Sequence, residues 1–168
     1  LGLEYPNLIR EAFAESSWTT AEANLTRAIE MAMQPPERIA LTIQNEDWNY
    51  DGIDTSPAPG LDASIGGAIE ALTGKPFGDG STLSACALIT GVIKSVDVKT
   101  CGYSGLMLPV IEDEVLAQRA SEGRYTVEEL LLFSSVSGTG LDVIPIPGNT
   151  PVEVIANLYR DVAALSVK

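Results

Sequence analysis

Long stretches in which apolar residues recur at helical spacing alternate along this 168-residue chain with short apolar runs, and Gly, Pro or Asp marks most of the changes. Helical spacing predicts helices over 6–16, 19–34, 36–43, 62–72, 81–96, 112–121, 126–133 and 150–165. The short apolar runs predict strands over 52–55, 106–110 and 143–146. This alternation indicates an α/β fold. Neither a repeat nor a linker divides the sequence, so residues 1–168 are expected to form a single domain.

Several boundaries carry local signals. Three Thr/Glu pairs have the spacing of a capping box and predict helix starts: Thr19 with Glu22, Thr126 with Glu129, and Thr150 with Glu153. Asp62 is a further expected helix cap. Pro35 and Pro36 are expected to end one helix and open the next, because proline lacks a backbone N–H. Gly138-Thr139-Gly140 is read as a turn.

The charge balance limits the partners. Ten Lys and Arg residues stand against 23 Asp and Glu residues, which gives a net charge of −13. Nucleic-acid binding and anionic membrane surfaces both require clustered basic residues, so neither partner is expected. No apolar run has the ~18 residues that a membrane-spanning helix needs. With only Cys86 and Cys101, a disulfide scaffold is not expected, and a reducing cytoplasm is the predicted compartment.

The sequence contains no histidine. Its absence excludes a Ser-His-Asp or Cys-His catalytic set, a His-ligated zinc site and a His-ligated haem within this chain. Any catalysis by this chain therefore relies on carboxylates, Cys, Ser, Lys or Tyr. Cys86 lies in an apolar run and is expected in the core, whereas Cys101 lies beside Gly102 in a loop and is expected to be the more reactive thiol.

Three loops combine flexible small residues with polar groups beside a predicted strand, over 52–60, 100–113 and 137–151. Loops at strand ends are where α/β proteins place binding groups. We therefore expect a small-molecule or enzymatic site built from Asp54, Ser56, Cys101, Ser104, Glu112, Asp113 and Asp142. Asp54 and Asp142 would act as polar or acid/base groups. Two other interpretations are that Glu112 and Asp113 simply favour a helix N-terminus, and that all three loops are only turns.

A metal-binding alternative rests on the segment from Asp47 to Gly52. Asp47, Asn49 and Asp51 occupy positions 1, 3 and 5 of a calcium loop, and Gly52 occupies the position of its sharp turn. Position 12 is Ala58, where such loops use a bidentate Glu. The alternative function is accordingly a non-catalytic calcium-binding or interaction module, with calcium or magnesium as the candidate ion.

Three sequence blocks resemble one protein family. They are GIDTSPAPG at 52–60, CGYSGLMLPVIEDE at 101–114 and SGTGLDVIPIPGNTPVEVIANLYRDVAAL at 137–165. In order and spacing they resemble domain-of-unknown-function family 711, also called uncharacterised protein family 0210, over about residues 51–165. The resemblance implies a helix-rich, C-terminal portion of a β/α barrel similar to the ten-stranded barrel of glycyl-radical enzymes. It also implies that the partner is the remainder of a longer family polypeptide or another copy of the chain.

Overall fold

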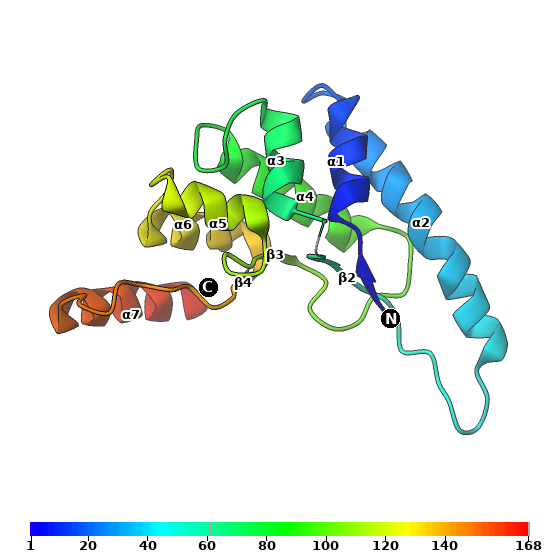
Figure 1. Ribbon diagram of the computed structural model, residues 1–168. Coiled ribbons are helices and arrows are strands. Elements are labelled where there is room, and N and C mark those ends of the chain that lie inside the picture. Colours follow the sequence, from blue (N-terminus) through cyan, green and yellow to red (C-terminus); the bar gives the residue numbers. More distant parts are fainter. Residues whose placement is uncertain (61, 168) are drawn as a thin grey trace.

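The computed structural model describes residues 1–60 and 62–167 (Figure 1). Its elements, in chain order, are β1 Gly2–Glu4, α1 Pro6–Ala14, α2 Ala21–Ile43, β2 Asp54–Ala58, α3 Ile65–Thr73, α4 Thr82–Ser95, β3 Leu106–Leu108, α5 Glu114–Ser121, α6 Val127–Ser137, β4 Gly138–Leu141 and α7 Val152–Ser166. Two helices follow each of the first three strands. The predicted α/β class is confirmed.

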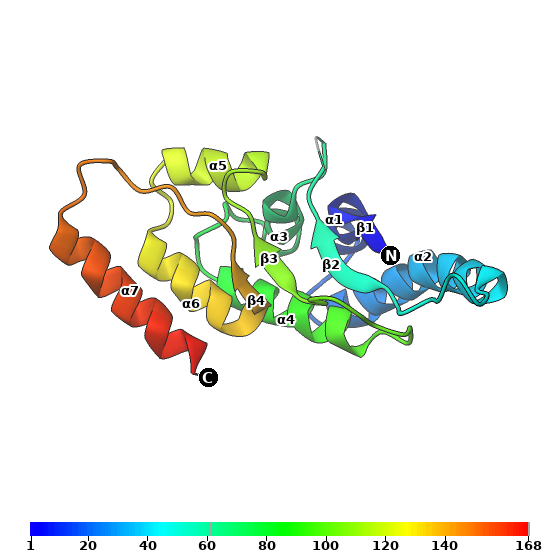
Figure 2. The same cartoon turned by 90° about the horizontal axis from the view of Figure 1, so that it is seen from below.

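The strands lie side by side in the order β1, β2, β3, β4 (Figure 2). β1 pairs in parallel with β2, and β3 pairs in parallel with β4. A parallel bridge between Ile53 and Thr100 joins the two pairs, so all four strands share one direction. Within residues 1–60 and 62–167, β1 and β4 each pair on one side only, and no barrel closure is seen.

Helices α1 to α6 cover one face of these strands, while the view from below shows the strands in front of the helices (Figures 1 and 2). β2 shows the expected two-residue alternation: Thr55 and Pro57 are buried toward the helices, and Asp54 and Ser56 are half-buried on the other face. Helix α4 lies at the centre of the core, with Ile89 and Ile93 fully buried. The helices therefore leave one face of the strands uncovered.

The expected break at Pro35 and Pro36 is wrong, because α2 runs through both prolines. Each proline removes one helical hydrogen bond, but the buried face of the helix continues across them. Leu25, Ile29 and Met33 lie before the prolines and Ala40 after them, and all four are buried. Packing of this continuous apolar stripe outweighs the local preference for a break.

Helix starts follow the sequence signals only in part. The capping box of Thr126 and Glu129 is present at α6. The boxes at Thr19 and Thr150 are not formed: α2 begins after Thr20 and α7 after Pro151, in both cases without a side-chain cap. Asp62 does not cap a helix either, because Ser64 caps α3 by accepting a hydrogen bond from the Gly67 N–H.

The last strand was expected in the wrong segment. Residues 138–140, read as a turn, belong to β4, and the predicted strand at 143–146 is not formed. Leu141 pairs with Leu108, and Gly138 pairs with Leu106. Glycine at 138 and 140 adopts positive φ, which allows an irregular strand, whereas Pro145 interrupts the apolar run that follows.

Two further properties concern the whole described chain. Cys86 and Cys101 are both free thiols, and burial raises the pKa of Cys86 to about 12.

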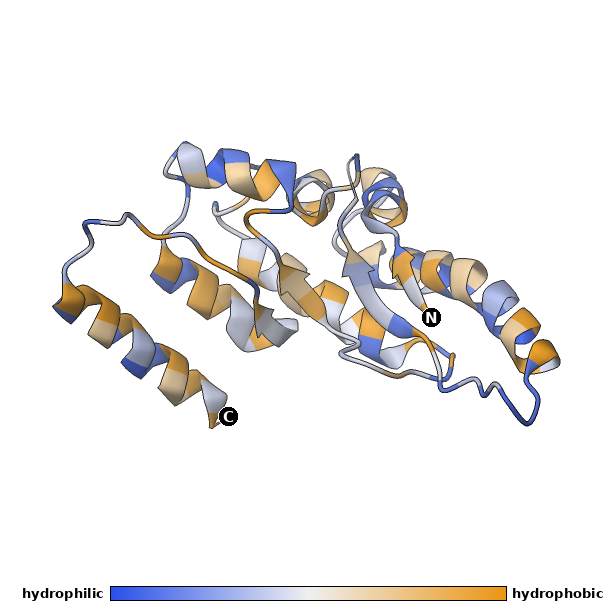
Figure 3. Cartoon of the chain, turned by 60° about the horizontal axis from the view of Figure 1, so that its bottom comes forward, coloured by the Kyte–Doolittle hydropathy of each residue, from blue (hydrophilic) through white to orange (hydrophobic). Residues whose placement is uncertain are grey.

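Apolar segments recur along α6 and along most of α7 (Figure 3). Among the described residues, no helix combines the length and the apolar character needed to span a bilayer.

Candidate functional site

The uncovered face of the strands carries polar side chains where a second layer of a core would carry apolar ones. Asp54 and Ser56 of β2 lie on this face and are half-buried. Met107 of β3 is half-buried between two buried leucines and belongs to the same side of the sheet. We call the group of Asp54, Ser56, Ser104 and Cys101 on this face the Asp54 cluster.

The Asp54 carboxylate organises the loop that precedes β3. Its Oδ1 accepts hydrogen bonds from the Ser56 and Ser104 N–H groups, both at 3.0 Å, and its Oδ2 accepts one from the Tyr103 N–H at 3.1 Å. Gly102 has φ +63°, and a Cβ there would clash with the same carboxylate. The backbone N–H groups of Tyr103 and Ser104 therefore donate to the Asp54 side chain and not to a neighbouring strand.

Ser56 and Ser104 complete the join between β2 and β3. The Ser56 hydroxyl accepts a hydrogen bond from the Gly105 N–H at 3.1 Å. The Ser104 hydroxyl donates to the Cys101 carbonyl at 2.9 Å and accepts from the Thr55 N–H at 3.3 Å. The structure thus brings four of the seven predicted site residues together at the amino ends of β2 and β3.

The ionisation of Asp54 follows from this geometry. Partial burial acts to raise its pKa, but hydrogen bonds from Ser56, Ser104 and Tyr103 outweigh it and lower the pKa below its ordinary value. Asp54 is therefore an anion at neutral pH, and its charge is held by backbone N–H groups. No Lys or Arg of the described residues pairs with it.

We expect Asp54→Asn to lower the free energy of unfolding by about 1 to 2 kcal/mol at neutral pH, because the amide accepts fewer of these hydrogen bonds. The folded-state pKa is lowered, so the contribution is fully present above the unfolded pKa of about 3.9 and is lost as pH falls through the folded pKa. Urea unfolding of wild type and Asp54→Asn, from neutral pH down through the folded-state pKa, measures this contribution.

Asp142→Asn is the control and should change stability by less than about 0.5 kcal/mol. A wild-type advantage that does not shrink on acidification contradicts the assignment.

Asp113 lies elsewhere, buried between the N-termini of two helices. It caps α5 by accepting a hydrogen bond from the Leu116 N–H at 3.0 Å. It also accepts from the Ser64 hydroxyl at 2.6 Å and from the Ile65 and Gly66 N–H groups of α3 at 2.6 and 3.3 Å. This carboxylate joins α3 to α5, in line with the interpretation that it favours a helix N-terminus.

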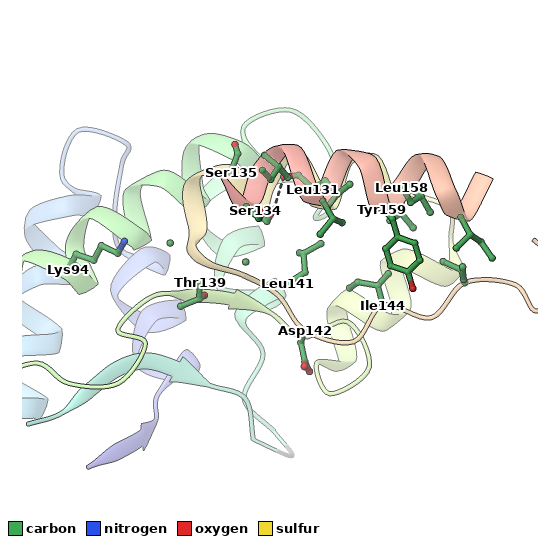
Figure 4. Close-up of a pocket in the computed structure, with 18 residues that line it drawn as sticks. Lys94, Leu131, Ser134, Ser135, Thr139, Leu141, Asp142, Ile144, Leu158 and Tyr159 are labelled. Carbon is green, nitrogen blue, oxygen red and sulfur yellow. Dashed lines mark hydrogen bonds between the residues drawn. The ribbon is translucent and has the colours of Figure 1, made fainter. Parts of the chain in front are cut away.

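Glu112 and Asp142 follow β3 and β4 at the opposite ends of these strands from the Asp54 cluster. Glu112 is exposed. Asp142 lines a cavity of about 1070 Å³ between α6, β4 and α7, and neither Asp54 nor Cys101 lines it (Figure 4). The seven predicted residues therefore do not share a single hollow.

This cavity also contains groups that the sequence did not single out. Lys94 lies at one end of it and Tyr159 at the other (Figure 4). The Lys94 ammonium lies against Gly138, where a Cβ would come within 2.6 Å of Nζ. The hydroxyls of Ser134 and Thr139 lie between these ends. The only signal for Lys94 was its position as the one charged residue of an otherwise uncharged helix, α4.

The three predicted calcium ligands, Asp47, Asn49 and Asp51, are exposed, and their loop is hydrogen-bonded locally. The Asn49 amide donates to Asp51 Oδ1 at 3.1 Å, and the Asp47 N–H donates to Asn45 Oδ1 at 2.8 Å. In the part of the chain that the structure describes, no three His, Cys, Asp or Glu side chains are grouped so that they could hold a metal ion.

Comparison with known proteins decides the family. The profile of the family described as "Uncharacterised ACR (DUF711)" matches residues 1–168. The chain belongs to the DUF711 family. A UPF0210 protein of Pyrobaculum aerophilum is 34% identical over 119 residues, which are 68% of this chain and 27% of that protein. UPF0210 proteins of Lactobacillus helveticus and Actinobacillus pleuropneumoniae are 27% and 26% identical over 99% of this chain, which corresponds to 40% and 39% of their lengths.

The chain thus spans between about a quarter and two fifths of the length of these curated DUF711 relatives. The resemblance inferred from the loop sequences is confirmed.

Proposed function

We propose that this chain forms part of a DUF711 protein that binds a small, positively charged molecule against the uncovered face of its strands. The observation that carries the proposal is the Asp54 cluster, an ionised carboxylate flanked by Ser56 and Ser104 on a half-buried sheet face. A buried core layer on this face would require apolar residues at these positions. Polar residues there suit contact with a polar ligand.

The charge of the loops at the carboxyl ends of the strands supports a cationic ligand through long-range attraction. The segments that follow β2, β3 and β4 contain Asp62, Glu112, Asp113 and Asp142, and none contains Lys or Arg before the next helix begins. Together with the net charge of −13, these residues make the electrostatic potential at the carboxyl ends of the strands negative. Glu112 and Asp142 would attract the ligand, and Asp54 and Ser56 would contact it.

In this proposal the chain acts with the remainder of a longer family polypeptide, which completes the α/β barrel that the resemblance implies. A cytoplasmic location accords with the free thiols of Cys86 and Cys101. The calcium alternative at Asp47, Asn49 and Asp51 gains no support from the geometry of that loop.

The proposal is tested by thermal unfolding of the chain with spermidine, choline and free lysine, and with succinate and glycerol as anionic and neutral comparisons. A cation at about 100 times its Kd should add about 2.7 kcal/mol to the free energy of unfolding, and the effect should weaken as salt is added. Ser56→Ala should weaken the binding of that cation about tenfold, because it removes one hydroxyl contact.

Ser134→Ala is the matched control, since Ser134 lies on α6 away from the Asp54 cluster. It should leave the affinity unchanged. The proposal fails if none of the three cations stabilises the protein, or if Ser134→Ala weakens binding as much as Ser56→Ala does.

A further inference from the structure

Between α6, β4 and α7 lies the cavity described above, which we call the β4 groove. The whole of β4 forms one wall of it, and the others come from α6, α7 and the segment after β4. Its volume is about 1070 Å³. The groove therefore follows the full length of an edge strand and is not a pit among loops.

Helix α7 presents an apolar face to this groove and buries none of its residues. Ile155, Leu158, Val162 and Leu165 recur at helical spacing and all line the groove. Leu131 of α6 and Ile144 face the same space (Figure 4). Burial of apolar area is what normally stabilises an amphipathic helix, so this face of α7 has the composition of a buried one.

The backbone of β4 also favours a docked strand. β4 pairs with β3 on one side, and among the described residues its other side pairs with nothing. Strands β1 and β2, and likewise β3 and β4, are parallel neighbours separated by two helices. Helix α7 returns the chain to the vicinity of β4, as both views show (Figures 1 and 2). A parallel strand that follows α7 would enter the sheet at this edge, about 4.8 Å from β4.

We infer that the β4 groove is the docking site for one further parallel β-strand, supplied by the part of a complete DUF711 polypeptide that follows α7. The strand extends the sheet at β4 and buries the apolar face of α7 against its own side chains. This chain spans 27 to 40% of the length of its relatives, so a complete family polypeptide contains further sequence, and the inference places the strand in the part that follows α7. The inference rests on the proposal that the chain acts within a longer polypeptide, but not on any ligand.

The residues that line the β4 groove indicate which groups the docked strand would carry. Its apolar side chains would face Leu158 and Val162 of α7. At the other end, Lys94 makes no hydrogen bond or ion pair with the described residues. A carboxylate or a backbone carbonyl opposite Lys94 would accept a hydrogen bond from its ammonium. The occupant is therefore an apolar strand with an acceptor at the Lys94 end.

Thiol labelling tests this assignment. Val162→Cys and Val152→Cys, each in a Cys101→Ser background, place one thiol in the groove and one on the same helix outside it. Val162 is 46% exposed and Val152 82% exposed in this chain. Both thiols should react readily in residues 1–168. In a complete DUF711 polypeptide that contains this sequence, the thiol at 162 should react at least about tenfold more slowly than the one at 152.

Hydrogen exchange provides a measurement that needs no substitution. Those amides of residues 138–141 that point away from β3 should exchange markedly more slowly in the complete polypeptide than in residues 1–168, because a new strand would accept from them. Equal labelling at 162 and 152 in the complete polypeptide, together with unchanged exchange at 138–141, overturns the inference. Protection in residues 1–168 that rises with protein concentration also overturns it, because a second copy then fills the groove. Neither readout depends on the cation-binding proposal.

Discussion

Asp113→Asn should lower the free energy of unfolding by about 3 kcal/mol, more than a typical loss of one helix cap. The carboxylate accepts from the Ser64 hydroxyl, from two N–H groups at the start of α3 and from the Leu116 N–H of α5. An Asn side chain has one acceptor oxygen, so its NH₂ group would face donors that are buried and left unpaired. The cost is large because one residue serves two helices.

Urea unfolding measures this effect, and Glu112→Gln is its neighbour control. Glu112 is exposed and its side chain makes no hydrogen bond with the described residues, so its substitution should change stability by less than about 0.5 kcal/mol. If Asp113→Asn unfolds at the same urea concentration as wild type, Asp113 does not join α3 to α5.

Phe77→Ala should lower the free energy of unfolding by about 4 kcal/mol. Phe77 is fully buried although it lies in the turn between α3 and α4. Its ring makes edge-to-face contacts with Tyr125 at 5.2 Å and with Phe133 of α6 at 5.5 Å between centroids. Truncation therefore removes both aromatic contacts and leaves a cavity where the α3–α4 turn meets α6.

Leu132→Ala on α6 is the comparison for this variant. Leu132 is an exposed residue of the same helix as Phe133, and its truncation should cost less than about 1 kcal/mol. Guanidinium unfolding should place Phe77→Ala well below both wild type and Leu132→Ala. Similar losses for the two variants would mean that the aromatic contacts of Phe77 contribute little.

Local signals in the sequence predicted those parts of the fold that local chemistry controls. The capping box predicted at Thr126 formed, and α3 ends at Gly74 in the left-handed conformation that glycine favours. Thr19 and Thr150 have the same spacing relative to Glu, yet each of their helices begins one residue later than the capping box predicts. Spacing alone therefore identifies a helix start, but the turn before the helix decides which residue becomes the cap.

Long-range contacts account for the remaining differences. β4 contains two glycines and no continuous apolar run, and it becomes a strand because β3 lies beside it. The predicted site residues Asp54, Ser56, Cys101 and Ser104 did meet, because loop 101–104 folds around one carboxylate. Asp142 lies apart from them since it follows β4 at the far end of the strands. Which end of a strand a loop occupies depends on strand direction, and composition does not reveal it.

The prolines inside α2 have a mechanical consequence. Pro35 and Pro36 offer no N–H, so the carbonyl oxygens one turn earlier, at Met31 and Ala32, lose their usual intrahelical donors. The helix beyond them extends away from the body of the molecule, with Ile39 and Ile43 open to solvent (Figure 1). We therefore expect thermal opening to begin in this arm, which can bend or fray about the proline pair while the first three turns stay rigid.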